Sequence, residues 1–558
     1  MSLSQQVDIA QVEGGDEIFN SDFLEYLIAL NDRFTPMIHS LRLERNNVLK
    51  DCLDNQTLPL NNEISTVPDD WKVPSIPDDL NQPGIEITGP ASITGMFINA
   101  LNPGPGGIRA EGDLDDDEDA AGHRLLDTVT AAKNRLAAVK GTLEHYDKAR
   151  DKEYKLAPGN IPFFMHRERG LHLDEPDVKI NNHPVPACLL GAGLTMYYCG
   201  REQINQGSGL YFYLPKMESA KEAGFWKEFF DFSKNHLNND DASTIRAIPL
   251  IESLPLAFQM DEVLYALGPY AVGLNAARWD FKASIFEFIM TNPNFVWPDR
   301  FGVDIKTTPF LANIFRRLVA TCLNRGGIAI GGMATALPSK DTEVNAAAAA
   351  SIQADKQWEA EQGFLRGWVA HIFHMKTAAD PFKSLRSSGW KPSASMSNPD
   401  NYPISIEVPE GPITIGGTRR NVRMVIEYIE GWLRGRGAKG IDSLEGKPGI
   451  HGPLMEDLAT GRMSVAQVAQ RIIHSVKDSE TGETHSAGLV RSIVQEELGD
   501  ILKIRAEQFG PEYPREYYTK AAKITLQWIK SYTELDFRSL GSYSREDLET
   551  IANSPDAL

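Results

Sequence analysis

Eight short apolar runs, separated by segments of helical character, limit the fold of this sequence more than any other feature. Buried parallel strands have nearly continuous apolar sequences and are connected through helices. The runs are Ile85–Pro90, Gly107–Asp113, Pro162–Gly170, Leu210–Lys216, Arg246–Glu252, Ala271–Asp280, Gly327–Gly332 and Gly367–His371. Their number and order predict an α/β protein with a (β/α)8 TIM barrel, and a doubly wound open sheet is the competing arrangement.

Polar residues close most of these runs. In a (β/α)8 barrel the functional side chains lie at the carboxyl ends of the strands. The closing segments are Arg167-Glu168-Arg169-Gly170, Lys216-Met217-Glu218, Glu252, Arg278-Trp279-Asp280, Gly331-Gly332-Met333 and His371. We therefore expect one functional site at the mouth of the barrel.

The chain of 558 residues is too long for one ordinary domain, and its pattern changes along its length. Residues 1–84 combine an amphipathic helix at Phe23–Leu30 with a Pro-rich connector, which predicts a helical N-terminal part. Residues 85–376 form the predicted barrel, and the Ser-, Pro- and Asn-rich stretch 377–408 predicts a linker. Apolar residues at helical spacing predict a mostly helical domain over 409–558, with helices near 422–433, 464–475, 487–508 and 515–533.

The charge balance limits the partners. Lys and Arg number 56 and Asp and Glu 76, which gives a net charge of −20, and this charge repels phosphate backbones and anionic membranes. We expect no nucleic-acid partner and no membrane partner. The four cysteines lack CxxC spacing, which disfavours a zinc site or a disulfide framework and is typical of a reducing compartment. With no targeting signal recognised, the sequence predicts a cytoplasmic protein.

Two carboxylates end adjacent runs of the predicted barrel, Glu252 the fifth and Asp280 the sixth. Both are therefore expected in one mouth. Mg²⁺ prefers oxygen ligands and often takes one or two protein carboxylates, leaving positions for substrate oxygens. The structural alternative, which composition alone favours, is that Glu252 caps a helix and Asp280 pairs with Arg278.

Arg167 near the end of the third run and the acidic tract after the second are further candidates. An arginine at a barrel mouth polarises a carbonyl or binds a carboxylate, whereas the alternative is a loop-stabilising pair with Glu168. The tract Asp113–Asp119 is interpreted mostly as a solvated face or a helix N-terminus. Asp115 and Asp116 are expected to support the metal from outside its ligand shell.

The segment Gly331-Gly332-Met333 matches no nucleotide-binding motif, but glycines allow a ligand to approach the backbone closely. We predict cofactor contacts at these three residues. Arg278 and Trp279 join Asp280 as predicted substrate-binding residues. The histidines His172, His371 and His374 lack the spacing of metal ligands and are interpreted as structural.

Ten segments, in order and at characteristic spacing, cover nearly the whole chain. They are Ile85–Pro90, His166–Leu173, Tyr211–Ser219, Ile251–Glu262, Gly273–Phe281, Gly331–Ala334, Trp368–His371, Val408–Thr414, Tyr428–Gly435 and Leu454–Thr460. Taken together, they resemble malate synthase of the shorter, A-type form. One segment alone is not specific, but the ordered set is.

The resemblance implies a TIM barrel with an N-terminal helical clasp and a C-terminal helical plug. It further implies Mg²⁺-dependent condensation of acetyl-CoA with glyoxylate, followed by hydrolysis of malyl-CoA to malate and CoA, as in the glyoxylate cycle. Glu252 and Asp280 match the magnesium ligands of the family. Arg167 matches the arginine that stabilises the developing alkoxide, and Asp457 matches the base that removes a methyl proton from the thioester. Without the resemblance, Asp457 would be interpreted as a surface acid.

The sequence also departs from the family pattern. Family members commonly have GLNCGRWDY where this chain has Ala276-Ala277 and Phe281, and Pro-Gly-Leu where it has Ile372-Phe373-His374. The acidic segment Asp113–Asp116 replaces DFED, and about ten residues around Glu445–Gly452 resemble an insertion. Two alternatives therefore stay open: a related condensing enzyme with another α-keto acid or acyl-CoA, and a non-catalytic barrel that binds a dicarboxylate or CoA. The sequence does not determine the oligomeric state.

Overall fold

Eight parallel strands form a closed barrel in the computed structural model, which describes residues 6–60, 66–238, 244–305, 308–442, 452–510 and 513–554. The strands are β2 (Gly84–Gly89), β3 (Gly112–Asp116), β6 (Phe163–Arg167), β9 (Leu210–Leu214), β10 (Ile245–Ile251), β11 (Gly273–Ala276), β12 (Ile328–Ala334) and β13 (Arg366–Val369). The last strand pairs with the first, with Trp368 opposite Glu86. The predicted (β/α)8 barrel is confirmed, and the open-sheet alternative is wrong.

The second barrel strand lies further along the chain than predicted. The prediction covered Gly107–Asp113, whereas β3 is formed by Gly112–Asp116, the start of the acidic tract. It pairs with β2 on one side and β6 on the other, and all the acidic residues of Asp113–Asp119 are buried. The interpretation of this tract as a solvated face is therefore wrong. Cationic side chains of neighbouring elements, which the local sequence does not reveal, contact several of its carboxylates.

Alternate strand residues fill the barrel interior, as the two-residue period of a strand requires. The interior cluster is Leu80, Leu114, Met165, Tyr211, Tyr213, Ile248, Leu250, Val272, Ala277, Ile328, Ile330 and Trp368. On β6 the inward-facing set continues from Met165 to Arg167, and after β10 it continues from Leu250 to Glu252. Strand geometry thus aims these two polar side chains at the mouth.

Helices surround the barrel. They are α4 (Thr94–Leu101), α5 (Leu125–Val139), α6 (Ala187–Leu194), α7 (Arg201–Asn205), α8 (Ala220–His236), α9 (Leu254–Ala257), α10 (Met260–Leu267), α11 (Arg278–Ile289), α12 (Pro309–Arg325), α13 (Thr342–Gln362) and α14 (Met375–Ser387). A π-helix, η1 (Thr195–Gly200), joins α6 to α7, and a hairpin of β4 (Glu144–Asp147) and β5 (Lys152–Lys155) precedes β6. Because α14 runs to Ser387, the loop predicted to begin at 377 begins instead after that residue.

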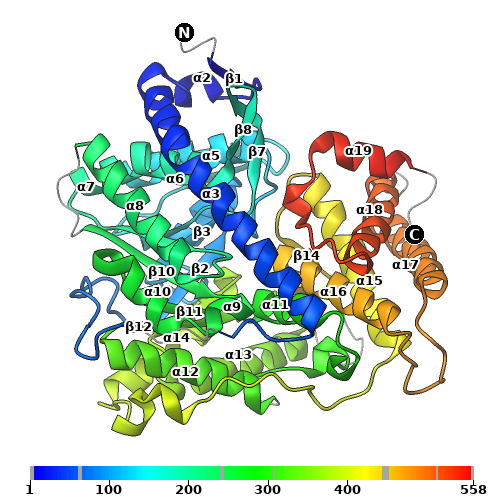
Figure 1. The fold of residues 1–558 in the computed structure, drawn as a ribbon. Coiled ribbons are helices and arrows are strands. Elements are labelled where there is room, and N and C mark those ends of the chain that lie inside the picture. The colour runs from blue at the N-terminus through cyan, green and yellow to red at the C-terminus, as the bar shows by residue number, and fades with distance from the viewer. Residues whose placement is uncertain are drawn as a thin grey trace.

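The N-terminal part is mainly one long helix. After α2 (Gly15–Ile18) comes helix α3 (Ser21–Asn55). Its N-cap is Asn20, whose side chain accepts a hydrogen bond from the backbone N–H of Phe23 at 3.0 Å. It runs along the outside of the barrel and packs on α6, α8 and α11 (Figure 1). The prediction of a helical N-terminal part is incomplete, because this part also contains a strand. Strand β1 (Val7–Ile9) pairs with β7 (Asp174–Ile180), which in turn pairs with β8 (His183–Pro186).

The C-terminal helices gather on one side of the barrel, in yellow, orange and red in Figure 1. They are α15 (Ile415–Leu433), α16 (Leu458–Ile473), α17 (Ala487–Phe509), α18 (Arg515–Thr533) and α19 (Arg545–Asn553), with a hairpin of β14 (Lys439–Ile441) and β15 (Leu454–Glu456). The four predicted helices are confirmed, whereas α19 and the hairpin were not predicted. Helix α16 packs on α11 of the barrel. The predicted insertion around Glu445–Gly452 lies, up to residue 451, outside the described residues.

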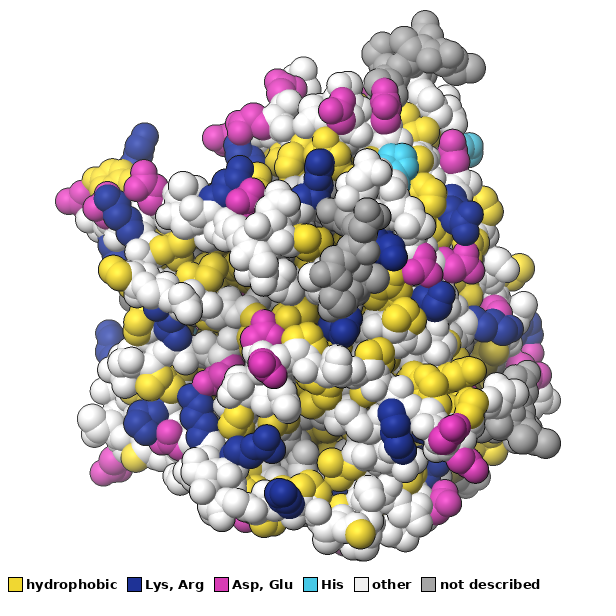
Figure 2. Space-filling view, turned by 90° about the vertical axis from the view of Figure 1, so that its left-hand side faces the viewer, with side chains coloured by type: hydrophobic (Ala, Val, Ile, Leu, Met, Phe, Trp, Pro, Cys, Tyr) yellow, Lys and Arg dark blue, Asp and Glu magenta, His cyan; other side chains and the backbone are white. Residues whose placement is uncertain are grey.

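The surface in Figure 2 shows acidic and basic side chains interspersed over one face. The four cysteines, Cys52, Cys188, Cys199 and Cys322, are buried free thiols. Among the helices in the described ranges, none combines the length and the apolar character needed to cross a bilayer. The boundaries predicted at residues 84, 376 and 408 remain predictions for the division into domains.

Candidate active site

Three buried carboxylates converge at the mouth of the barrel. Asp119 follows β3, Glu252 follows β10, and Asp280 lies in the first turn of α11. One oxygen from each lies within 4.8 Å of the others. The structure thus brings together the two predicted metal ligands, Glu252 and Asp280, and adds a third carboxylate that the sequence analysis missed.

This cluster suits a hard divalent cation. Burial raises the pKa of Glu252 well above its usual range, and the negative charges of Asp280 and Asp119 raise it further against the opposing effect of Lys216. Glu252 Oε2 has no hydrogen-bond partner within the described part of the chain. Carboxylates that repel one another and keep a lone pair free are the oxygen donors that Mg²⁺ prefers.

The structural alternative for these two carboxylates is wrong. Glu252 Oε1 accepts the backbone N–H of Lys216 rather than capping a helix. Asp280 pairs with Lys216 and, at 3.3 Å, with Arg462. The guanidinium of Arg278 instead lies 3.3 Å from Glu359.

Arg167 lies beside the carboxylates at the carboxyl end of β6. Its Nε donates to Asp116 at 2.7 Å, and its Nη1 lies 3.2 Å from Asp119. The guanidinium also lies 5.4 Å from the centre of the Trp368 ring in the barrel interior. The loop pair with Glu168 is wrong as an alternative, because Glu168 binds Arg135 at 3.0 Å.

The two predicted supporting aspartates lie on opposite faces of β3. Asp116 contacts Arg167, and this position agrees with a supporting role. Asp115 faces the outer helices, where it accepts from Arg135 at 2.9 Å and lies 2.7 Å from Nδ1 of His166. The expectation that Asp115 supports the ion is corrected here, since neighbouring strand residues point to opposite faces.

Asp457 reaches the mouth from the C-terminal domain. It is the N-cap of α16, and its side chain accepts the backbone N–H of Thr460 at 3.3 Å. Burial raises its pKa well above the usual range, and the charges of Asp119 and Asp280 raise it further, against a lowering by Arg167. The interpretation of Asp457 as a surface acid is therefore wrong, since its carboxyl group is partly buried among the charges of the barrel mouth.

Arg462 ties α16 to the barrel. It lies one turn beyond Asp457 and contacts Asp280 at 3.3 Å, while its Nε donates to Glu287 on α11 at 2.8 Å. Tyr532 of α18 donates to the same Glu287 at 2.8 Å. The base candidate and the metal cluster are thus held together by contacts between two domains.

The remaining predicted site residues lie beside α11. Arg278 donates to the carbonyl of Met333 at 3.4 Å, and the backbone N–H of Gly332 donates to Glu359 at 3.0 Å. A Cβ atom at Gly331 would lie 2.3 Å from Glu359, and one at Gly332 would lie 2.6 Å from Arg278. Close approach of these side chains explains both glycines. Contacts of this segment with a cofactor remain a prediction.

Trp279 and the three histidines have other neighbours. The Lys282 ammonium lies 4.3 Å from the centre of the Trp279 ring. His371 accepts the backbone N–H of Phe373 at 3.2 Å, His172 lies 3.4 Å from Glu118, and His374 is buried. These contacts agree with the structural interpretation of the histidines, while substrate binding by Arg278, Trp279 and Asp280 remains a prediction.

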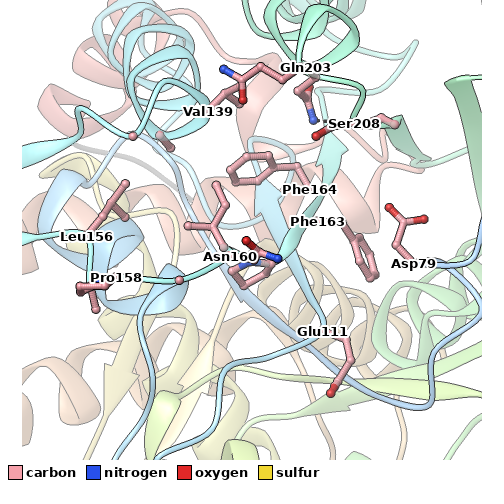
Figure 3. A pocket seen from close by; sticks show the side chains of 18 of the residues that line it. Asp79, Glu111, Val139, Leu156, Pro158, Asn160, Phe163, Phe164, Gln203 and Ser208 are labelled. Carbon is pink, nitrogen blue, oxygen red and sulfur yellow. Dashed lines mark hydrogen bonds between the residues drawn. The ribbon is translucent and has the colours of Figure 1, made fainter.

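Two cavities lie at opposite ends of the barrel. The mouth cavity has a volume of about 420 Å³ and is lined by Lys216, Glu252 and Asp280, by Arg45 of α3, and by residues 535–539 and 542. The other cavity, of about 770 Å³, lies where β6 and β9 begin and is lined by Asp79, Glu111, Phe163, Asn160 and Gln203, among others (Figure 3). The larger cavity contains none of the converging carboxylates, so we place the chemistry in the smaller one.

Sequence reasoning missed four groups at the mouth. Asp119 was hidden in an acidic tract, and Lys216 was noted only as the end of a strand. Arg462 lies in a helix without a distinguishing motif. Tyr428 has a buried hydroxyl group whose pKa is raised by burial and by the negative charge of Asp457. It lies in Tyr428–Gly435, one of the ten segments that resemble malate synthase, and was given no role. Its place in that segment was the available signal.

Three carboxylates lie at the mouth of the closed (β/α)8 barrel, and a second domain contributes a fourth carboxyl group. This arrangement is typical of metal-dependent enzymes that abstract a proton from carbon. Such a site combines a divalent metal with a base for proton abstraction. The comparison with known proteins gives the family.

Residues 163–398 match the family profile "Malate synthase, TIM barrel domain", and residues 412–545 match "Malate synthase, C-terminal". Malate synthase A of Escherichia coli is 35% identical over 534 residues, covering 94% of this chain and 95% of that protein. A malate synthase of Streptomyces clavuligerus is 34% identical, covering 95% and 96%, and a glyoxysomal one of Gossypium hirsutum is 33% identical, covering 82% and 79%. The chain belongs to the malate synthase family and is an acyltransferase of that type.

Proposed function

We propose that this enzyme condenses acetyl-CoA with glyoxylate and hydrolyses the malyl-CoA formed, which yields malate and free CoA. One observation carries the proposal: Asp457, on a separate domain, lies within electrostatic reach of Arg167, Asp119 and Asp280. A site that only bound a dicarboxylate or CoA would have no chemical need for a second carboxyl group placed in this way.

Asp119, Glu252 and Asp280 are the residues that would hold Mg²⁺. When bound there, the ion supplies Lewis-acid chemistry, drawing electron density from the carbonyl of the keto acid and offsetting its negative charge. Arg167 provides a fixed positive charge beside this position and stabilises negative charge that develops on the aldehyde oxygen.

Asp457 is the base in this proposal. Its carboxylate removes a proton from the methyl group of the acetyl thioester, and the resulting carbanion attacks the aldehyde carbon of glyoxylate. A raised pKa brings a carboxyl group closer to the working pH, where general-base catalysis is most effective. The packing of α16 on α11 places the proposed base and the proposed metal ligands on facing elements of one site.

The test is release of free thiol from acetyl-CoA in the presence of glyoxylate and Mg²⁺. The wild-type enzyme is expected to release CoA only when all three are present. A panel of other keto acids and acyl-CoAs tests the alternative of a related condensing enzyme, which would prefer another pair. Release of no thiol from any pair would contradict the condensing class and favour the non-catalytic alternative.

Ala277 bears on the choice of keto acid. It precedes α11, three residues before Asp280, and its methyl group belongs to the interior cluster with Trp368. We propose that this methyl group, which stands where the family commonly has glycine, leaves less space for the keto acid and favours a small one such as glyoxylate. In Ala277→Gly, the ratio of kcat/KM for pyruvate to that for glyoxylate is expected to rise; an unchanged ratio would exclude this role for Ala277.

We propose the cytoplasm as the compartment. The four buried free thiols support a reducing environment. Microscopy of a fluorescent fusion in the native cell tests this, and enclosure of the fusion in an organelle, as in the glyoxysomal relatives, would contradict it.

A further inference from the structure

Lys216 places its ammonium group among the three carboxylates of the proposed metal site. Its Nζ lies 3.1 Å from both oxygens of Asp119 and 3.6 Å from Glu252 Oε2, and it donates a hydrogen bond to Asp280. The ammonium therefore occupies the position from which a cation contacts all three groups. Lys216 is 8% exposed.

The backbone at Lys216 supports a specific role for this side chain. Its φ angle is +52°, in the left-handed region that residues with a Cβ rarely adopt. The backbone N–H donates to Glu252 at the same time as the ammonium approaches it. Strained backbone of this kind persists where surrounding structure enforces it, and it often marks functional positions.

We propose that Lys216 and Mg²⁺ compete for Asp119, Glu252 and Asp280, so that Lys216 lowers the metal affinity of the enzyme. An ion bound to all three carboxylates would occupy the space that the ammonium now fills, and two positive charges so close together repel strongly in a buried site. Binding of Mg²⁺ therefore requires the ammonium to move away. The inference rests on the proposed function in taking Mg²⁺ as the ion.

The mouth cavity provides space into which the ammonium group of Lys216 can move. Lys216 lines it together with Glu218, whose pKa burial raises to about 7 against the charge of Arg45. A lysine side chain has a flexible four-carbon stem, so its head group can leave the cluster while the backbone stays fixed. Until the metal binds, Lys216 then acts as a positioning residue, because its charge offsets the mutual repulsion of the three carboxylates and keeps them together.

Titration of Mn²⁺ into the full-length enzyme after removal of metal tests the competition, without substrates and with binding followed by electron paramagnetic resonance. Lys216→Met keeps an unbranched side chain that is one atom shorter and removes its charge, so the Kd of the variant for Mn²⁺ is expected to be lower by about tenfold or more. Lys221→Met is the matched control, since Lys221 is exposed on α8 and pairs with Glu44; its Kd should match the wild type. An unchanged or higher Kd in Lys216→Met would overturn the inference.

A second measurement uses the wild-type enzyme and does not depend on folding of the variant. Reductive methylation followed by peptide mass spectrometry reports the accessibility of each lysine amine. Methylation of Lys216 is expected to rise several-fold when Mg²⁺ replaces chelator, while that of Lys221 stays constant. Unchanged or reduced methylation of Lys216 would contradict displacement. Neither measurement involves turnover, so failure of the thiol-release assay would overturn the proposed reaction and leave this result standing.

Discussion

The barrel interior and the barrel mouth both contain buried charge, but the two clusters are balanced differently. In the interior, both oxygens of Glu86 have partners: Arg366 at 3.1 Å on one, and Tyr213 at 2.6 Å and Trp368 at 3.0 Å on the other. At the mouth, three carboxylates share Lys216, and an oxygen of Glu252 has no hydrogen-bond partner within the described residues. We call the Glu86 cluster closed, because both carboxylate oxygens have partners, and such a cluster stabilises the fold. We call the mouth cluster open, because an oxygen of Glu252 is left without a hydrogen bond in the part of the chain that the structure describes and is able to bind a ligand.

Asp457→Asn is expected to give the largest effect at the mouth. An amide cannot accept the methyl proton, so kcat should fall by about 10³-fold, within the range that general bases contribute. Affinity for Mn²⁺ should change little, because Asp457 is not one of the three converging carboxylates that we propose as metal ligands. Steady-state thiol release and Mn²⁺ titration measure the two quantities. A variant with nearly normal kcat would show that the base lies elsewhere.

Glu86→Gln tests the closed cluster and should act on stability rather than on chemistry. Loss of the carboxylate leaves Arg366 buried without its counter-charge, which costs about 3–5 kcal/mol of unfolding free energy. Chemical denaturation followed by circular dichroism measures this cost, and kcat of the folded fraction should stay within about twofold. A large fall in kcat with little loss of stability would reverse the distinction between the two clusters.

Glu252→Gln is expected to show the opposite pattern. Affinity for Mn²⁺ should fall by about 100-fold because a charged ligand is lost. In the absence of metal the variant should be more stable than the wild type by about 1 kcal/mol, since one of three mutually repelling carboxylates has been removed. Thermal unfolding with chelator and with excess Mg²⁺ checks both signs. Destabilisation in chelator would mean that this cluster is as closed as that of Glu86.

His166 provides a smaller, pH-dependent test on the outer side of β6. Burial lowers its pKa, but Asp115 and Cys199 outweigh that effect and raise it to about 10. A raised pKa adds stability at pH values below about 6.5 that is lost as the pH rises through about 10. The unfolding free energy of the wild type should therefore fall between these values by at most about 1.4 kcal/mol per pH unit relative to His166→Gln. Parallel pH profiles would show that His166 is neutral in the folded enzyme.

The parts of the molecule that could be predicted are those whose burial follows from the order of apolar and polar residues nearby in the sequence. Seven of the eight barrel strands overlap predicted apolar runs and extend at most two residues beyond them, and Glu252 was placed at the mouth because it ends such a run. Strand β3 was displaced because Gly-Asp-Leu-Asp-Asp looks solvated, and its neutralising partners Arg135 and Arg167 come from distant elements. Asp119 was missed for the same reason.

Lys216 and Asp457 show two further limits of sequence reasoning. A left-handed backbone at a lysine has no sequence signature, so the direction of that side chain was not predictable. The importance of Asp457 came from resemblance alone, because its neighbours at the mouth depend on how two domains pack. The charged groups that shift its pKa, Asp119, Asp280 and Arg167, lie more than 170 positions away in the sequence.

Arg462 connects the two halves of the reaction. A single guanidinium on the helix that begins with the proposed base, Asp457, also contacts the proposed metal ligand Asp280 and, through Glu287, the body of the barrel. If the helical domain were displaced, Asp280 would lose a counter-charge at the same moment as the thioester lost its base. A molecule in which the two domains are misassembled would therefore lose both activities together. It would not deprotonate acetyl-CoA in the absence of a bound keto acid to receive the carbanion.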